Sequence, residues 1–231
     1  MGAVRHWVDA LGTGVLDLLY PPRCLNCGAR PESPDLPLCP TCLQRLERAP
    51  AMAVAARLDR LAEAYVLDGA FALWVFDKGG ALQEIQHALK YGDRPRYGYT
   101  LGTLVGTGYA ERWPVPDGVI PIPLHRLRKL ERGYNQAAML GEGVAEALDC
   151  PLCTEGLARP RPTRSQTHLS RAERWENVSG AFEARTSFDG GTWLLVDDVL
   201  TTGSTASAAA QVLKKAGAQR VLLATLAMVR V

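Results

Sequence analysis

The sequence lacks any long apolar run. Its 231 residues contain no stretch of the roughly 20 apolar residues that a membrane-spanning helix needs, so we expect no membrane insertion. Residues 4–19 have the pattern of an amphipathic helix, but Asp9 and Asp17 interrupt the apolar core that a signal peptide requires. His6 also breaks the myristoylation pattern. With these targeting signals lacking, we expect a cytoplasmic location.

The chain also lacks an excess of one charge. The formal net charge is +2, so bulk charge does not indicate a nucleic-acid partner. Basic residues are nevertheless clustered in two segments, 124–134 and 158–174. Such clusters suggest a local anionic ligand, although a solvated surface explains any single arginine equally well.

Internal repeats and low-complexity tracts are absent, and the remaining pattern is that of an ordinary globular protein. We predict strands at 70–76, 119–123, 193–196 and 220–229, with a further candidate at 151–158. We predict helices at 81–90, 136–148 and 204–216, a helical segment at 44–66 that Pro50 interrupts, and a helix candidate at 97–112 that several glycines weaken. Strands that alternate with helices indicate an α/β fold with a parallel sheet, and such sheets bind ligands at the carboxyl ends of their strands.

Four of the six cysteines lie in the segment CLNCGARPESPDLPLCPTC as two C-x-x-C pairs: Cys24 with Cys27, and Cys39 with Cys42. Two such knuckles supply a tetrahedron of thiolates, which suits structural zinc. Gly28 could provide the left-handed residue of the first knuckle. Disulfides or a redox dithiol are the alternatives. The third pair, Cys150 and Cys153, stands alone, and we interpret it as two buried apolar thiols.

The segment TWLLVDDVLTTGSTASAAAQVL, residues 192–213, carries the strongest functional signal. An apolar strand leads to Asp197 and Asp198, then to a hydroxyl-rich loop, and then to a helix. A helix start presents unpaired N–H groups that suit a phosphate, and Gly203 lets the backbone approach it closely. The four hydroxyl side chains of the loop, which are Thr201, Thr202, Ser204 and Thr205, add donors.

The acid pair precedes this phosphate cradle by about one sugar length. Carboxylates can accept hydrogen bonds from a ribose diol and can help to hold magnesium through water. The implied ligand is therefore a ribose 5-phosphate. The loop has no lysine after its glycine and too few glycines for a dinucleotide fingerprint, which excludes those two nucleotide motifs. A capping loop with solvated acids is the plain alternative.

The string VDDVLTTGST resembles the phosphoribosyl pyrophosphate loop of type I phosphoribosyltransferases. Together with the cysteine segment, four further motifs make the whole chain similar to the ComF family of competence proteins: LKYGD, IPIPLH, ERGYNQA and RWENVSGAF. The resemblance implies a phosphoribosyltransferase-like parallel sheet flanked by helices at 49–231, preceded by an N-terminal helix and a four-cysteine zinc module at 1–48.

The resemblance also implies roles for individual residues. Asp197 and Asp198 would hold the ribose hydroxyls, and residues 201–205 would hold the 5′-phosphate. The basic loop after the 119–123 strand would bind pyrophosphate, and the arginine-rich segment at 159–174 would form a flexible lid. The cationic residues assigned to the pyrophosphate are Lys90, Arg126, Arg132 and Arg164.

Two functions follow from the resemblance. The first is a magnesium-dependent phosphoribosyltransferase, linked to nucleoside metabolism, to competence and to DNA uptake in natural transformation. The second is a non-enzymatic competence factor that uses the pocket for sensing and binds single-stranded DNA or a partner such as a helicase. Because no base-binding hood is recognisable, the sequence names no acceptor and leaves enzymatic turnover undecided.

Overall fold

A computed structural model of the chain describes residues 21–54, 66–92, 94–162 and 180–230. The chain divides into two compact units, Met1–Leu46 and Glu47–Val231. The domain boundary that we predicted after residue 48 stays a prediction. The helix predicted at 4–19 lies outside the described residues. Within the described ranges, no helix combines the length and the apolarity needed to cross a membrane.

In its described residues, 21–46, the first unit is built around its cysteines rather than around an apolar core. The backbone N–H of Gly28 donates to the carbonyl of Cys24, and Gly28 has a φ of 75°, the left-handed residue expected for the first knuckle. The second knuckle runs into the five-residue helix α2 (Pro40–Gln44). The sulfur atoms of Cys24, Cys27, Cys39 and Cys42 are thereby brought together.

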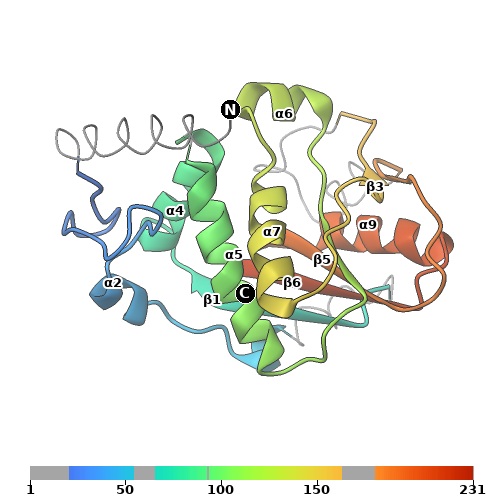
Figure 1. The fold of residues 1–231 in the computed structure, drawn as a ribbon, viewed down its shortest axis with the longest axis horizontal. Coiled ribbons are helices and arrows are strands. Elements are labelled where there is room, and N and C mark those ends of the chain that lie inside the picture. The colour runs from blue at the N-terminus through green and yellow to red at the C-terminus, as the bar shows by residue number, and fades with distance from the viewer. Residues whose placement is uncertain (1–20, 55–65, 93, 163–179, 231) are drawn as a thin grey trace, which may run out of the picture. The chain divides into compact units, whose positions relative to one another are not determined.

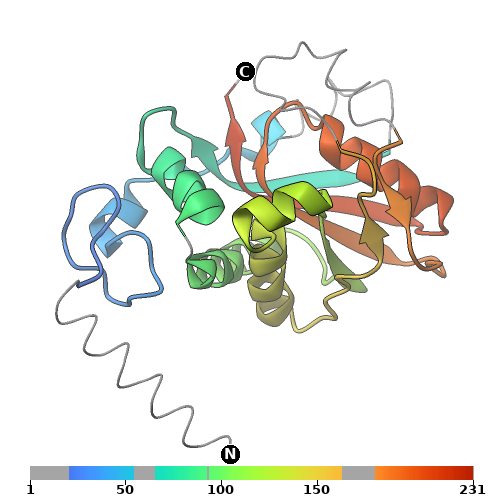
Figure 2. The same cartoon turned by 90° about the horizontal axis from the view of Figure 1, so that it is seen from above.

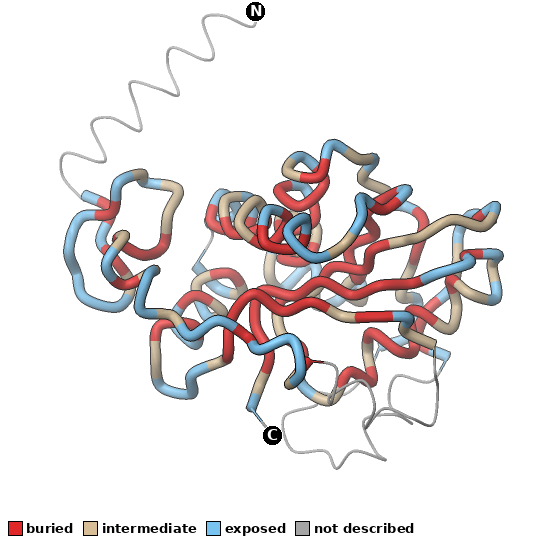
Figure 3. The backbone as a smooth tube through the Cα atoms, turned by 90° about the horizontal axis from the view of Figure 1, so that it is seen from below, coloured by how far each residue is buried: buried red, intermediate tan, exposed pale blue. Residues whose placement is uncertain are grey.

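The second unit contains a four-stranded sheet in the order β1-β6-β5-β2, and all of its neighbouring strands are parallel (Figure 1). Its strands are β1 (Gly69–Phe76), β2 (Gly118–Pro121), β5 (Thr192–Leu200) and β6 (Arg220–Val229). The predicted parallel sheet is confirmed. Residues 221–228 of β6 are all buried, as expected of a parallel strand covered on both faces (Figure 3).

Helices α5 (Pro95–Ala110) and α7 (Gln136–Leu148) cover one face of the sheet, and α9 (Ser204–Lys215) covers the other (Figure 2). The glycines of α5, which weakened the helix prediction, have a packing role. A Cβ at Gly102 would lie 2.1 Å from the carbonyl oxygen of Leu140 in α7. The absence of a side chain at this position therefore lets the two helix backbones come into direct contact.

Two further helices and a short strand pair also belong to this unit. Helix α4 (Ala81–Tyr91) packs beside α5, where Leu89 approaches Gly98. Helix α6 (Arg126–Arg132) follows β2 and buries none of its residues. Strands β3 (Leu157–Ala158) and β4 (Glu183–Ala184) form a separate antiparallel pair.

Several predicted elements were wrong in extent or type. The 193–196 strand continues to Leu200, so the acid pair lies inside it. The basic segment after β2, predicted as a loop, contains α6, since Arg, Leu, Lys and Glu favour helix even without a buried face. The helical segment predicted at 44–66 is interrupted near Pro50, as expected: Arg48 forms an antiparallel bridge with Trp74, residues 51–54 are helical, and residues 55–65 lie outside the description.

Two further expectations about the 150–158 region also need correction. Cys150 and Cys153 are half-buried rather than buried. The candidate strand at 151–158 is reduced to the two residues of β3, with an isolated parallel bridge between Leu152 and Val119. The segment runs along β2 only briefly and therefore leaves both thiols partly exposed.

Candidate functional site

The acid pair lies near the carboxyl end of β5, where successive side chains point to opposite faces of the sheet. Leu195 belongs to the apolar cluster that includes α9 residues, so Asp197, two residues on, faces the α9 side. Asp198 faces the opposite side, where α4 reaches it. The extension of β5 therefore gives the two carboxylates different neighbours, although both line one cleft, which is described below.

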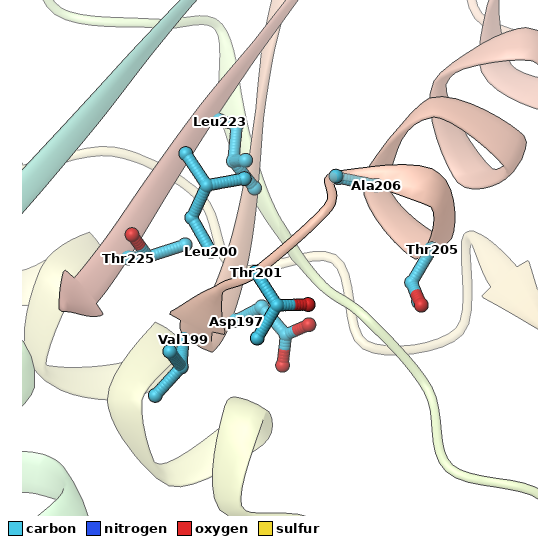
Figure 4. Close-up of a pocket in the computed structure, with 9 residues that line it drawn as sticks. Asp197, Val199, Leu200, Thr201, Thr205, Ala206, Leu223 and Thr225 are labelled. Atoms are coloured by element: carbon cyan, nitrogen blue, oxygen red, sulfur yellow. The ribbon is translucent and has the colours of Figure 1, made fainter. Parts of the chain in front are cut away.

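A small cavity of about 30 Å³ lies between the end of β5 and the first turn of α9 (Figure 4). We call it the loop cavity. Its lining includes Asp197, Thr201, Gly203 and Thr205. Gly203 adopts a φ of 79° at the N-cap position, so no side chain of its own caps α9. The geometry leaves the helix start available to an anion at the point where the sequence predicted a phosphate.

The other two hydroxyls of this loop are used within it. The Oγ atoms of Thr202 and Ser204 lie 3.0 Å apart as a hydrogen-bonded pair, and Ser204 is buried. Neither residue lines the loop cavity. Thr202 and Ser204 therefore shape the loop, while Thr201 and Thr205 present side chains to the cavity (Figure 4).

A larger cleft of about 700 Å³ adjoins the loop cavity, and both share Asp197, Val199, Thr201 and Thr205. We call it the main cleft. A volume of this size suits a small-molecule ligand. Its walls come from α4, α6, the segment after β2, the start of α7 and the residues after β3. Its cationic lining residues are Lys90, Arg128, Arg132 and Arg159.

The residues predicted to bind pyrophosphate lie in different surroundings. Lys90 and Arg132 line the main cleft, and the guanidinium of Arg132 also lies 5.9 Å from the ring centre of Tyr91. Arg126 is exposed on α6 and is not among the residues that line the cleft. Arg164 and most of the predicted lid lie outside the described residues.

The two acids have opposite electrostatics. Burial, together with the negative charge of Asp198, raises the pKa of Asp197 to about 7. Burial also disfavours the charge on Asp198, but the positive charge and hydrogen bond of Lys90 outweigh it, and the pKa of Asp198 is lowered. One acid is therefore held as a carboxylate, while the other titrates near neutral pH.

Sequence reasoning missed several residues that line the main cleft, among them Gln86, Arg128 and Gln136. Gln136 is 4% exposed, and its Oε1 has no hydrogen-bond partner among the described residues. Buried polar atoms are normally satisfied, so an orphan acceptor on a cleft wall points to a ligand. The ERGYNQA motif contained Gln136, but only the fold places it at the first turn of α7, facing the cleft.

The cysteine cluster has the geometry of a metal centre. The four sulfur atoms all lie within 4.8 Å of one another, and those of Cys27 and Cys39 are 3.7 Å apart. Tetrahedral zinc–thiolate bonds of about 2.3 Å place sulfurs roughly 3.8 Å apart, so the residues fit zinc. Burial opposes ionisation of Cys24, but backbone N–H groups outweigh it and lower the pKa of this thiol to about 6. The side-chain amide of Asn26 also donates to the sulfur of Cys42 at 3.3 Å.

Comparison with known proteins assigns both parts of the chain to a class. Residues 135–230 match the phosphoribosyl transferase domain, and residues 15–53 match the double zinc ribbon domain. Together with the parallel sheet, these matches define a type I phosphoribosyltransferase-like fold with an N-terminal zinc ribbon. The cluster of four cysteines is the structural zinc site of this ribbon.

Curated relatives narrow the class to a family. The chain is 34% identical over 152 residues to DNA utilization protein YhgH of Shigella flexneri, covering 64% of this chain and 67% of that protein. It is 36% identical over 110 residues to Competence protein F of Haemophilus influenzae, and the match covers 46% of this chain and 48% of that protein. The protein belongs to the ComF family, and the predicted resemblance is confirmed. The match to the Haemophilus protein spans about half of that relative's length.

A solved structure of glutamine phosphoribosylpyrophosphate amidotransferase from B. subtilis also resembles the chain. The sequence identity is 22% and the TM-score 0.39, covering 59% of this chain and 30% of that one.

Proposed function

We propose that the main cleft binds phosphoribosyl pyrophosphate with magnesium, and that the protein acts in competence and DNA uptake. The observation that carries the proposal is the shared lining of the loop cavity and the main cleft, where Asp197 lies near a helix start whose N-cap residue, Gly203, has no side chain. The 5′-phosphate would lie at the loop cavity, the ribose at the acids, and the diphosphate among the cations of the main cleft. The names of the two relatives support the biological context.

Magnesium fits this site as a companion of the ligand rather than as a resident ion. It would be carried by the diphosphate, with the acids reaching only its water shell. In a transferase reaction, a nucleophile displaces pyrophosphate from C1 of the ribose while positive charge develops on the ring. Arg128, Arg132 and Arg159 would stabilise the departing diphosphate.

The experiment for this proposal is calorimetric titration of the full chain with phosphoribosyl pyrophosphate and magnesium. Saturable one-to-one binding is the expected result, and no heat of binding at millimolar ligand would end the proposal. Pyrophosphate release in the presence of a panel of nucleobases then tests turnover.

The second function, a competence factor that binds single-stranded DNA or a partner protein, has one specific observation in its favour. Helix α6 buries no residue, carries four cations and exposes Leu127 and Leu130; Leu127 and the exposed Tyr91 both line the main cleft. Cations with a nearby aromatic ring suit single-stranded nucleic acid. Ligand binding without pyrophosphate release, together with salt-dependent retention of an oligonucleotide, would favour this function.

Gln136→Met is expected to stabilise the free protein by about 1 kcal/mol and to lower the affinity for phosphoribosyl pyrophosphate about tenfold. The substitution removes a buried acceptor that has no partner, and ligand binding loses the group that would satisfy it. Thermal unfolding and calorimetry measure the two effects. Gln211→Met, a half-buried glutamine on α9, is the matched control and should change neither. A destabilised variant with unchanged affinity would show that Gln136 has only a structural role.

Ligand affinity is expected to rise about tenfold between pH 6 and pH 8, because ribose hydroxyls need the carboxylate form of Asp197, whose pKa is about 7. In the free protein, the pH dependence of folding stability has the opposite sign. The folded pKa exceeds the ordinary value of 3.8, so this acid's contribution to stability is lost as pH rises through about 7. Asp197→Asn should keep only the dependence that arises from the ligand's own phosphate. An identical pH profile in this variant would contradict the assignment.

A further inference from the structure

Both carboxylate oxygens of Asp198 have partners in the protein. Its Oδ1 accepts a hydrogen bond from the backbone N–H of Val199 at 2.9 Å. Its Oδ2 lies 3.1 Å from Nζ of Lys90 and accepts a hydrogen bond from Nε2 of Gln86 at 3.2 Å. With only 8% of the residue exposed, the carboxylate has its counter-ion and its hydrogen bonds before any ligand arrives.

Asp197 is engaged on one oxygen. Its Oδ1 accepts the backbone N–H of Asp198 at 2.9 Å, while its Oδ2 has no hydrogen-bond partner within the described residues. The side chain lies beside Thr201 and Thr205 at the loop cavity (Figure 4). Both acids line the main cleft, but the carboxylate oxygen without a partner among the described residues is on Asp197, whereas both oxygens of Asp198 already accept a bond.

The charged groups around the pair are unevenly distributed. Lys90 of α4 lies at Asp198, and Arg159, after β3, acts on Asp197 through its charge. The side chain of Arg159 also packs against the ring of Phe182, 5.1 Å from its centre. On the β6 side, Asp197 is paired in register with the buried, neutral Thr225. The ammonium of Lys90 thus forms its ion pair with Asp198, although its charge also acts on Asp197.

We infer that the acid pair has divided roles: Asp197 accepts the ribose hydroxyl, whereas Asp198, held by Lys90 and Gln86 of α4, is a positioning residue. Lys90 then acts on the ligand through Asp198 and not through the diphosphate, contrary to its predicted role. The inference rests on the proposed function and deepens it, because it assigns the sugar contact to one side chain.

The physical link between the two acids is short. The N–H of Asp198 donates to Oδ1 of Asp197, so fixing Asp198 against α4 also fixes the donor that orients Asp197. If Lys90 is removed, a buried carboxylate is left without its counter-ion next to the ligand-facing acid. Such an unpaired charge is costly and repels a second carboxylate. Removing the charge of Asp198 as well should relieve that penalty.

The test is a double-mutant cycle of Lys90→Met and Asp198→Asn, titrated with two ligands: phosphoribosyl pyrophosphate–magnesium and ribose 5-phosphate, which has no diphosphate. We expect Lys90→Met to lower the affinity for both ligands by the same factor, about tenfold. The double variant should bind better than Lys90→Met and about as well as Asp198→Asn. Lys90→Arg should stay within about threefold of wild type.

Gln86→Leu is the milder second variant, since it removes a neutral partner of Asp198 and leaves the ion pair. It should weaken both ligands equally, by about threefold. Thermal unfolding of every variant confirms that it is folded.

Two outcomes would overturn the division of roles: Lys90→Met weakening only the diphosphate ligand, or independent effects of the two substitutions. A wild-type protein that binds neither compound would overturn the proposed function, and this inference with it. A wild type that binds both compounds while the cycle is additive would remove the inference alone.

Discussion

Asp197→Asn is expected to lower the affinity for phosphoribosyl pyrophosphate about 30-fold at pH 8, where Asp197 is ionised. Asp198→Asn is expected to lower it by less than about fivefold. A charge-assisted hydrogen bond to a ligand hydroxyl contributes about 2 kcal/mol, and Asp197 has an oxygen without a partner among the described residues. Asp198 already accepts from Val199, Lys90 and Gln86, so its substitution changes the ligand contact only indirectly. Calorimetry with magnesium present measures both affinities.

Asp189→Asn is the matched control, because Asp189 is exposed and the change in charge is the same. This variant should bind like wild type. Equal losses in the Asp197 and Asp198 variants would contradict the asymmetry that the geometry of β5 creates. Unchanged binding in both would remove the acids from the site altogether.

Removal of zinc is expected to unfold the first unit. Of the seven buried residues in its described part, three are cysteines (Cys24, Cys39 and Cys42), three are prolines, and Leu38 is the one larger apolar side chain. Such a unit depends on metal, and binding free energies of about 10–16 kcal/mol in small zinc modules act as folding free energy. Cys39→Ser should lose the zinc, about one ion per chain in wild type, and become sensitive to protease within residues 21–46.

Cys153→Ser provides the control for this experiment, because Cys153 is half-buried and lies outside the cluster. It should keep its zinc and its protease resistance. Metal analysis of protein purified without chelator, followed by limited proteolysis with mass spectrometry, measures both effects. A metal-free wild type, or a Cys39→Ser protein with an intact first unit, would show that zinc does not hold this unit together.

Some elements could be predicted from local sequence to the residue. Helix α7 begins at Gln136 because the side chain of Asn135 accepts a hydrogen bond from the N–H of Ala137. It ends at Leu148, before Asp149 in a left-handed conformation. Strand β6 was predicted in full because an uninterrupted apolar run bounded by polar residues leaves little ambiguity.

The extent of β5 could not be predicted in this way. Carboxylates are unfavourable in the interior of a strand, so the pattern placed its end at Val196. The strand continues because Lys90 and Gln86, which belong to α4, satisfy Asp198. For the same reason, Gln136 gave no functional signal in the sequence: its orphan acceptor exists only where α7 meets the main cleft.

The sequence by itself determined the family, the parallel α/β fold, the thiolate set and the loop at 201–205, because each depends on residue types at short spacing. Only the tertiary structure decided how the two adjacent aspartates differ. Strand alternation turns their side chains to opposite faces of the sheet. The lysine that forms an ion pair with one of them belongs to α4, a helix far away in the sequence. Their environments are therefore set by packing rather than by their neighbours in the chain.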